Sequence, residues 1–243
     1  MSVDPIPSFS ERRVWFLRGM RNAFSVPGLI LATAHIGFAG LARDAGFGIV
    51  EAVFMVMAIW ALPAMVVIAG AVLSGAGLVA IAFAVALSSI RLTPMVVALV
   101  PEMRGSKTSR LTLYLLSHFV AITSWVIAMD ALRTVPRELR TSFYFGLGSS
   151  LVVINMIVVA VVYALAPTLP PAVMAALFLL TPMYFLTSLW GSAREAASNI
   201  AMVLGLFLGP LFHMVAPAFD LLMAGLLGGV GAYAIHRMRR SAT

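Results

Sequence analysis

Residues 141–193 read TSFYFGLGSSLVVINMIVVAVVYALAPTLPPAVMAALFLLTPMYFLTSLWGSA and contain no charged side chain. The hydrocarbon core of a membrane is about 30 Å thick, so one helical crossing needs about 20 predominantly apolar residues. Pro167 and the pair Pro170 and Pro171 divide the stretch, because proline cannot continue a helix. The stretch therefore predicts two transmembrane helices, at residues 143–166 and 171–190.

The composition of the whole chain indicates the same class. Of its 243 residues, 62% are hydrophobic and 10% are charged, whereas an average soluble domain has about 25% charged residues. Nine acidic and sixteen basic residues cannot cover a soluble domain of this length, and the apolar residues extend along the whole chain. Soluble, disordered, fibrous and single-anchor classes are therefore excluded, and the sequence predicts an all-α membrane protein.

Charge-free stretches, together with glycine and proline breaks, set the expected helices. We predict a polytopic bundle of about eight transmembrane helices, some short or broken, at residues 22–42, 50–74, 76–100, 111–132, 143–166, 171–190, 197–215 and 217–235. The last two are rich in glycine and proline, which is typical of close helix packing or of a transporter binding site. A single transmembrane domain at 22–236 then lies between a basic N-terminal segment, 1–21, and a basic tail, 237–243.

The basic residues, which give a net charge of +7, lie in short segments beside the predicted helices. No basic stripe is interleaved with stacking aromatic residues, so anionic lipid is the expected partner and nucleic acid is not. With the N-terminus inside, eight crossings place eleven arginines inside and four basic residues outside, namely Arg43, Arg104, Lys107 and Arg110. Since basic residues accumulate on the cytoplasmic side, both termini are expected there. If the second and third helices do not both cross fully, the cluster at 104–110 moves inside.

Several functional classes lack the residues that they need. Cysteine is absent, which excludes disulfides, thiolate catalysis and cysteine-bound metal. No His-x-x-His or Glu-x-x-His spacing is present, so we predict no metal and no cofactor. The stretch Gly146-Leu147-Gly148-Ser149-Ser150 resembles a serine-hydrolase motif only superficially, because it begins a helix and follows no strand. We therefore expect that the protein is not an enzyme.

Arg91 is the sharpest candidate for a binding residue. An ionisable side chain inside a membrane helix indicates function by default, since burying it costs at least about 2.5–3.5 kcal/mol. Arg91 lies beside Ser88 and Ser89, and Pro94 frees the carbonyl of Ile90. A guanidinium there can hold a substrate carboxylate through two hydrogen bonds. The alternative is that Arg91 reaches a membrane interface or neutralises a structural acid.

Other polar residues inside the predicted helices have less specific roles. His118, His35 and Asp130 are candidates for proton coupling, because histidine titrates near neutral pH. Each histidine could instead bond a backbone carbonyl, and Asp130 lies near a helix end, where charges are usually solvated. Asn155 must bond either a neighbouring helix or a substrate. Pro63 predicts a kink or a hinge in the second helix.

Three motifs in the N-terminal half occur in order, namely Arg21-Asn22-Ala23-Phe24, GFAGLARDAG at 37–46 and EAVFM at 51–55. On these motifs, and over about residues 20–130, the chain resembles the AzlC/YgaZ-type permeases, the large subunit of bacterial branched-chain amino-acid exporters. The family's Asn-x-Arg motif in the third helix corresponds here to residues 89–91. Its Ala-Gly-Ala-Ser-Gln break in the second helix corresponds to residues 61–65.

The resemblance implies an ion-coupled secondary transporter that exports small amino acids across the bacterial inner membrane, together with a small hydrophobic subunit of the AzlD type. Ser89 replaces an asparagine of the family and Met65 replaces a glutamine, so we expect a more apolar substrate or a changed coupling ion. Ser88, Ser89 and Asn155 would contact the substrate. The alternative is a membrane scaffold or assembly subunit without a substrate pathway, whose buried polar groups pair with one another.

Overall fold

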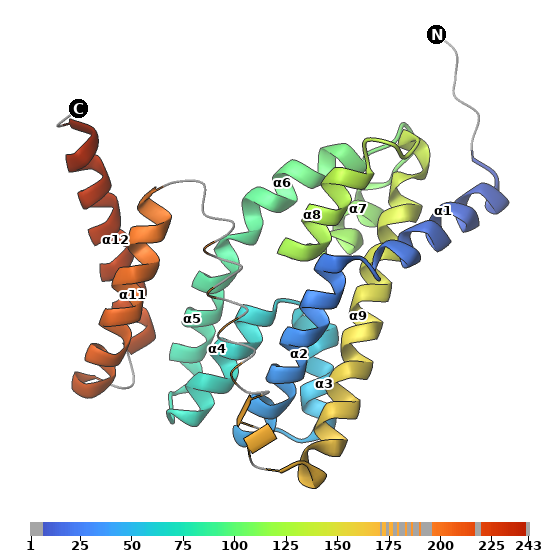
Figure 1. Cartoon of the computed structure of the whole chain (residues 1–243). Coiled ribbons are helices and arrows are strands. Elements are labelled where there is room, and N and C mark those ends of the chain that lie inside the picture. Colours follow the sequence, from blue (N-terminus) through green and yellow to red (C-terminus); the bar gives the residue numbers. More distant parts are fainter. Residues whose placement is uncertain are drawn as a thin grey trace.

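The computed structural model describes residues 7–170, 196–216 and 220–241, and scattered positions between 172 and 190. The described residues form helices and contain no β-strand (Figure 1). The all-α class is thereby confirmed. The predicted helix at 171–190 lies outside the continuously described residues.

The described helices follow the chain in the order of their numbers. They are α1 (Phe9–Asn22), α2 (Val26–Asp44), α3 (Ile49–Ile59), α4 (Leu62–Leu73), α5 (Leu78–Ile90), α6 (Leu92–Met103), α7 (Arg110–Ser117), α8 (Ile122–Ala131), α9 (Arg140–Leu165), α11 (Ala196–Val215) and α12 (Asp220–Ser241). Short 3-10 turns at Arg137–Leu139 and Ala166–Thr168 flank α9.

Helix α9 defines the two ends of the bundle. Its 26 residues extend about 39 Å, which is more than the thickness of a membrane core. At its C-terminal part, the Tyr163 hydroxyl donates a hydrogen bond to the carbonyl of Phe47 over 2.8 Å. At its start, Arg140 binds the carboxylate of Glu102 over 3.0 Å. We call the end at Arg140 the basic end and the end at Tyr163 the opposite end.

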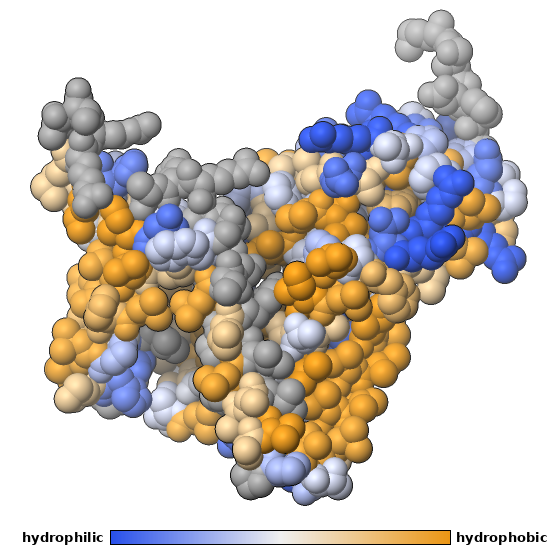
Figure 2. Space-filling view, viewed as in Figure 1, coloured by the Kyte–Doolittle hydropathy of each residue, from blue (hydrophilic) through white to orange (hydrophobic). Residues whose placement is uncertain are grey.

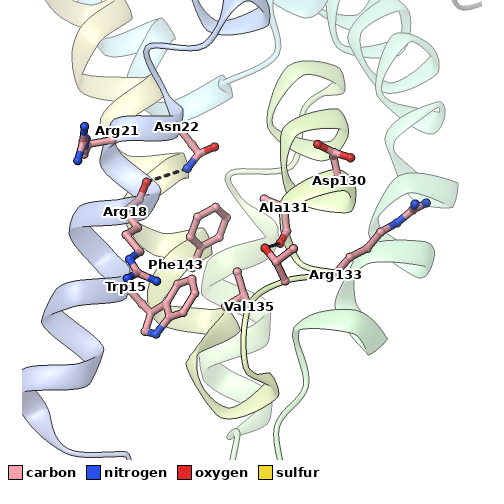
Figure 3. Close-up of a pocket in the computed structure, with 10 residues that line it drawn as sticks. Trp15, Arg18, Arg21, Asn22, Asp130, Ala131, Arg133, Val135 and Phe143 are labelled. Atoms are coloured by element: carbon pink, nitrogen blue, oxygen red, sulfur yellow. Dashed lines mark hydrogen bonds between the residues drawn. The ribbon is translucent and has the colours of Figure 1, made fainter.

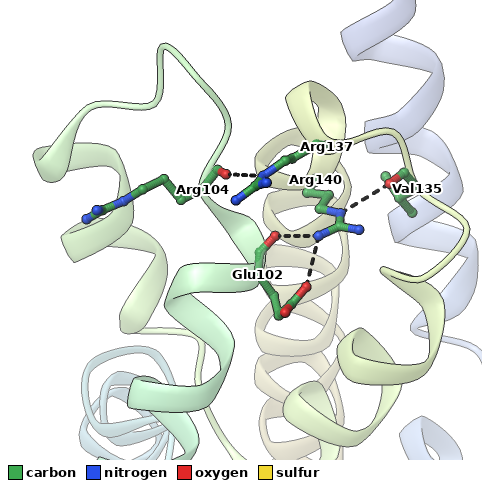
Figure 4. Close-up of polar contacts among 5 residues, drawn as sticks. All are labelled: Glu102, Arg104, Val135, Arg137 and Arg140. Carbon is green, nitrogen blue, oxygen red and sulfur yellow. Dashed lines mark hydrogen bonds and ion pairs between the residues drawn. The ribbon is translucent and has the colours of Figure 1, made fainter.

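The end of α6 and the start of α9 are joined by a cluster of polar contacts at the basic end (Figure 4). Arg140 donates to the carbonyl oxygens of Glu102 and Val135 as well as to the Glu102 carboxylate. Arg137 donates to the carbonyl of Arg104 over 2.9 Å. These contacts place residues 102–104 and 135–140 together, so α5 and α6 must run from the opposite end to the basic end.

Helices α3 and α4 form a hairpin that enters from the opposite end and returns to it. Helix α3 follows Phe47 at the opposite end, and α4 leads into α5, which starts at that same end (Figure 1). The chain reverses at Trp60, whose backbone is left-handed with φ 45°. With 11 and 12 residues, the two helices are about 16–18 Å long, or half a membrane core. The structure thus corrects the single crossing predicted at 50–74.

Helices α7 and α8 form the matching hairpin from the basic end. The loop before α7 lies at that end, where the Ser106 amide donates to the Glu138 carboxylate over 2.7 Å. The loop after α8 returns there, at Val135. The chain reverses between Ser117 and Ile122, where α7 ends and α8 begins. The crossing predicted at 111–132 is therefore also a hairpin of half-length helices.

Length and composition identify the described helices that can cross a membrane. Three pass this test, namely Val26–Asp44, Arg137–Thr168 and Ala197–Val215. A fourth is added if α5 and α6, which are bent by 46° relative to each other, form one span. The membrane character of the fold is confirmed, but a count of eight complete crossings is not.

Helices α11 and α12 pack on each other (Figure 1). Helix α11 continues through Pro210, and α12 continues through its glycines. A Cβ on Gly228 would lie 3.5 Å from the Gly205 amide nitrogen, and one on Gly231 would lie 3.4 Å from Leu204. Gly228 and Gly231 therefore lie in the packed contact between the two helices, as one of the two sequence interpretations proposed, whereas a Cβ on Gly209 or Gly229 would meet nothing within 4 Å.

Helix α1 lies against the first turns of α9, and two glycines allow the close approach. A Cβ on Gly19 would lie 2.0 Å from the carbonyl oxygen of Phe143, and one on Gly146 would lie 2.1 Å from that of Phe16. Backbone atoms cannot move aside as a flexible side chain can. Glycine is therefore required on both sides of this contact.

We expect Gly146→Ala to separate α1 from α9 and to destabilise the protein by about 1–3 kcal/mol, which is typical of overpacking. Cleavage of α1 by a protease in purified protein measures the separation. Gly229→Ala is the matched control, because a Cβ at Gly229 meets nothing within 4 Å. Equal protection of α1 in both variants would contradict the packing described here.

Candidate functional site

The tips of the two hairpins touch each other through reciprocal hydrogen bonds. The indole Nε1 of Trp60, on the α3–α4 hairpin, donates to the carbonyl oxygen of Phe119 over 3.0 Å. The imidazole Nε2 of His118, on the α7–α8 hairpin, lies 2.9 Å from the carbonyl oxygen of Met57. These four residues form what we call the tip junction. Each hairpin thus supplies a side-chain donor for a backbone carbonyl of the other.

His35 places the tip junction at the middle of helix α2. It is the tenth residue of the 19-residue helix α2, and its ring stacks on Trp60 with 6.2 Å between centroids. Only 2% of His35 is exposed, and its Nδ1 lies 2.9 Å from the carbonyl of Leu31. The described residues offer no hydrogen-bond partner to its Nε2. With Nδ1 donating to Leu31, Nε2 is a buried acceptor beside the junction.

One face of α9 supports the α7–α8 tip. A Cβ on Gly148 would lie 2.5 Å from the Cβ of Phe119, so glycine is needed for this approach. On the hairpin itself, the Ser124 hydroxyl donates to the Phe119 carbonyl and accepts from the Ala121 amide. Two turns further along α9, Asn155 is fully buried and donates to the Leu151 carbonyl over 2.7 Å.

The ends of four half-length helices, with their partial charges, lie at the tip junction. Helices α3 and α7 end at the tips, and α4 and α8 begin there. The carbonyls of Leu115, Leu116 and Ser117 at the end of α7 accept amides of the following turn. The ends of α3 and α7 carry partial negative charge, and the starts of α4 and α8 carry partial positive charge. Inside a membrane, such irregular backbone is tolerated only where it is buried in protein or lines a cavity. The tip junction therefore presents helix ends of both signs of partial charge.

The two hairpins occupy corresponding positions in an inverted repeat. Leu62 begins α4 and Ile122 begins α8, 60 positions later. The crossing helix before each hairpin ends at Asp44 and Met103, 59 positions apart. In the first unit the crossing helix runs from the basic end to the opposite end, and in the second it runs back. The units therefore have the same order of elements and opposite orientations.

The residues predicted from the sequence lie in three places. Arg91 connects α5 to α6 at the 46° bend and is half-buried. Ser88 and Ser89 precede it, and the Ser89 hydroxyl donates to the carbonyl of Val85 over 2.8 Å. The second place is the tips, where His35 and His118 lie, while Asn155 lies further along α9. The third is the basic end.

Two of the predicted residues have surroundings that differ from the expected ones. Pro63 is the second residue of α4, so it begins a helix and does not kink one. The break itself lies at Trp60 and Ala61, just before it. Asp130 is exposed near the end of α8 and lines a pocket at the basic end, half a membrane away from the tips.

This pocket lies between α1, the end of α8 and the start of α9 (Figure 3) and has a volume of about 740 Å³. Trp15, Val135 and Phe143 contribute apolar lining. The guanidinium of Arg18 lies 4.3 Å from the centroid of the Trp15 ring. Arg21 and Arg133 extend to different sides of the pocket (Figure 3). The arrangement fits an amphiphile at a membrane surface better than a small substrate.

Sequence reasoning missed the residues that join the tips. Trp60 lies inside a stretch that predicts a single crossing, and Met57 and Phe119 carry no polar side chain that would indicate a role. Their role depends on backbone carbonyls, which every residue has. The one available signal was Pro63, since proline is favoured in the first turn of a helix.

Comparison with known proteins gives one family match over the region that contains these elements. The family model described as AzlC protein matches residues 28–169, which is more than half of the chain. The matched region runs from α2 to the turn after α9 and includes both hairpins. No curated protein and no solved structure gives a significant match. The chain therefore belongs to the AzlC family of transport-related membrane proteins.

Proposed function

We propose that this protein is a secondary transporter that exports small apolar amino acids, such as branched-chain ones, across the bacterial inner membrane. Export is coupled to the movement of an ion along its gradient. One observation carries the proposal. Two half-length helical hairpins enter from opposite ends and touch at mid-depth, where Trp60 and His118 bond the facing backbone. Inverted repeats with broken helices at the midplane are typical of secondary transporters.

The arrangement supports alternating access to one central site. Withdrawal of the α7–α8 hairpin would open the tip junction to the basic end, and withdrawal of the α3–α4 hairpin would open it to the opposite end. In the present state both hairpins are in place and bonded to each other. This state corresponds to an occluded intermediate of such a cycle.

We assign the following roles at the site. Arg91 holds the substrate carboxylate from the bend in α5–α6, and Ser88, Ser89 and Asn155 provide polar contacts. The start of α4 at Pro63 is the hinge of its hairpin. For proton coupling, His118 and His35 are favoured by their position at the tips. Asp130 lies in the pocket at the basic end and would only relay protons between the histidines and the aqueous phase.

The hairpins also change the side of the membrane on which several basic residues are expected to lie. We propose that α2, α5–α6, α9, α11 and α12 cross the membrane and that the α3–α4 and α7–α8 hairpins do not. The sequence alone predicts one further crossing, at 171–190, which lies outside the continuously described residues. Fourteen of the sixteen basic residues are then cytoplasmic, leaving Arg43 outside and Arg91 within the membrane. Hydrophilic residues gather at the basic end, while hydrophobic ones cover the sides below it (Figure 2). This asymmetry favours a cytoplasmic basic end and two cytoplasmic termini.

Labelling of introduced cysteines tests this orientation, because the chain has no cysteine of its own. We expect Lys107→Cys and Thr134→Cys to react with a membrane-impermeant maleimide only from the cytoplasmic side, and Asp44→Cys and Ser74→Cys only from the outside. All four residues are exposed. Eight complete crossings would instead place Lys107 outside and Ser74 inside, so this pair of positions separates the two arrangements.

The proposed partners follow from the family and from the pocket at the basic end. A small hydrophobic subunit of the AzlD type would pack against the apolar sides of the bundle. An anionic lipid would place its phosphate near Arg18 and its apolar part on Trp15. Neither contact is needed for the chemistry at the tip junction.

The function is tested by uptake of labelled amino acids into vesicles that contain the purified protein with its small subunit. We expect uptake of leucine, valine and isoleucine, and we expect this uptake to depend on an imposed ion gradient. A scaffold subunit without a pathway would show no exchange for any amino acid, under conditions in which the protein remains folded. That result would favour the alternative function.

A further inference from the structure

Two backbone carbonyls at the tip junction are held by donors that belong to the opposite hairpin. The carbonyl oxygen of Met57 faces His118 Nε2, and that of Phe119 faces Trp60 Nε1. Met57 lies in the last turn of α3, and Phe119 lies two residues after the end of α7. Helix dipoles leave partial negative charge at both of these helix ends. Each tip is therefore a preformed site for a group that donates hydrogen bonds and carries positive charge.

We propose that these two carbonyl oxygens bind the primary ammonium group of the substrate, which replaces Trp60 Nε1 and His118 Nε2. The proposal rests on the proposed amino-acid transport and identifies the part of the substrate that the hairpin tips recognise. An ammonium group has three donors. The carbonyl oxygens of Met57 and Phe119 accept two of them, and His35 accepts the third.

The geometry around His35 supports this third contact. Its Nε2 is buried, and the described residues provide no hydrogen-bond partner for it. Trp60 covers the His35 ring and also bonds the Phe119 carbonyl. A single rotation of the Trp60 side chain would therefore uncover two of the three acceptors together. Binding of the ammonium group and release of the hairpin contact become one event.

This site distinguishes substrates by the group on their α-carbon. A 2-hydroxy acid keeps the carboxylate and the side chain of an amino acid but lacks the ammonium group. It offers one donor to three acceptors, of which His35 Nε2 is buried without a partner among the described residues, while the Phe119 carbonyl keeps its bond from the Ser124 hydroxyl. A buried acceptor that is left without a partner costs binding energy. Selection for an amine is thus separate from recognition of the carboxylate by Arg91.

Equilibrium binding of two labelled probes to the purified full-length protein tests the inference. The probes are leucine and 2-hydroxy-4-methylpentanoate, which has the same carbon skeleton. We expect the hydroxy acid to bind at least about tenfold more weakly. Trp60→Phe removes the internal donor but keeps an aromatic ring over His35, so leucine should bind about three- to tenfold more tightly.

A control variant and a second test variant separate an effect on binding from an effect on folding. Trp125→Phe removes another indole whose Nε1 has no hydrogen-bond partner among the described residues, and leucine affinity should not change. His118→Ala removes the second internal donor and should also tighten leucine binding. A residue with a merely structural role would weaken binding when replaced, so the sign of the change decides between the two roles.

The outcomes separate this inference from the proposed function. Equal affinity for leucine and the hydroxy acid, or weaker leucine binding in both Trp60→Phe and His118→Ala, overturns the ammonium site and leaves an amino-acid transporter in place. Absence of binding for every amino acid to the unmodified protein overturns both. Tighter binding in the two variants together with rejection of the hydroxy acid supports the site.

Discussion

Replacement of Arg91 by alanine is expected to abolish amino-acid exchange while the protein still inserts into the membrane and purifies normally. The guanidinium lies at the bend between α5 and α6, where it would neutralise the substrate carboxylate. Removing one partner of a buried charge pair costs about 2–5 kcal/mol. Exchange should therefore fall by at least about 30-fold. Uptake of labelled leucine into vesicles, normalised to the amount of folded protein, measures the effect.

Arg110→Ala is the matched control, because Arg110 is exposed at the first residue of α7 at the basic end. Exchange in this variant should remain close to that of the unmodified protein. Retained exchange in Arg91→Ala would remove Arg91 from the binding site. The carbonyl pair at the tip junction would then have to recognise the substrate with another partner for its carboxylate.

The second large effect is expected for Gly148→Ala. An added Cβ would lie 2.5 Å from Cβ and 2.6 Å from Cγ of Phe119. These atoms are at the base of the side chain and cannot move without the backbone of the tip. The Phe119 carbonyl would shift away from Trp60 Nε1, and the contact between the hairpins would be lost. We expect loss of exchange and a destabilisation of about 1–3 kcal/mol.

The measurement combines leucine exchange with thermal unfolding of the purified protein. Gly209→Ala, in α11, provides the comparison, since a Cβ there meets nothing within 4 Å. A Gly148→Ala protein with full exchange would show that the tips tolerate displacement. Support of the tip by α9 would then have no part in transport.

The inverted repeat explains why the excess of basic residues on the cytoplasmic side is smaller for eight complete crossings than for the folded chain. Eight crossings assign Arg104, Lys107 and Arg110 to the outer side, against the usual preference. Two hairpins bring these residues to the end that also holds Arg137 and Arg140. The sequence already indicates that this cluster moves inside if the second and third helices do not both cross fully. The polar contacts of Glu102 and Glu138 give the physical reason for it.

Arg91, His35, His118 and Asn155 stand out in the sequence because polar side chains are rare in apolar helices. The structure places His118 and His35 at the hairpin tips and Asn155 within α9. Their roles in binding or proton coupling stay predictions. Trp60, Met57 and Phe119 did not stand out, since their contribution comes from an indole donor and two carbonyls. No rule of spacing links Trp60 to Phe119, which are 59 positions apart.

Composition and hydropathy alone establish that this chain is a helical membrane protein, because burying so many apolar residues requires lipid, and lipid requires every backbone group to be bonded within a helix. They also locate helices such as α2 and α9, whose length matches the membrane. Hydropathy sums transfer free energies over a window of residues. It does not record whether the chain continues across the membrane or turns back within that window. A full crossing and a hairpin of two half-length helices therefore score alike. Whether the chain continues or turns back at Trp60 depends on contacts with distant residues, above all with Phe119 and His118, and these contacts exist only in the folded protein.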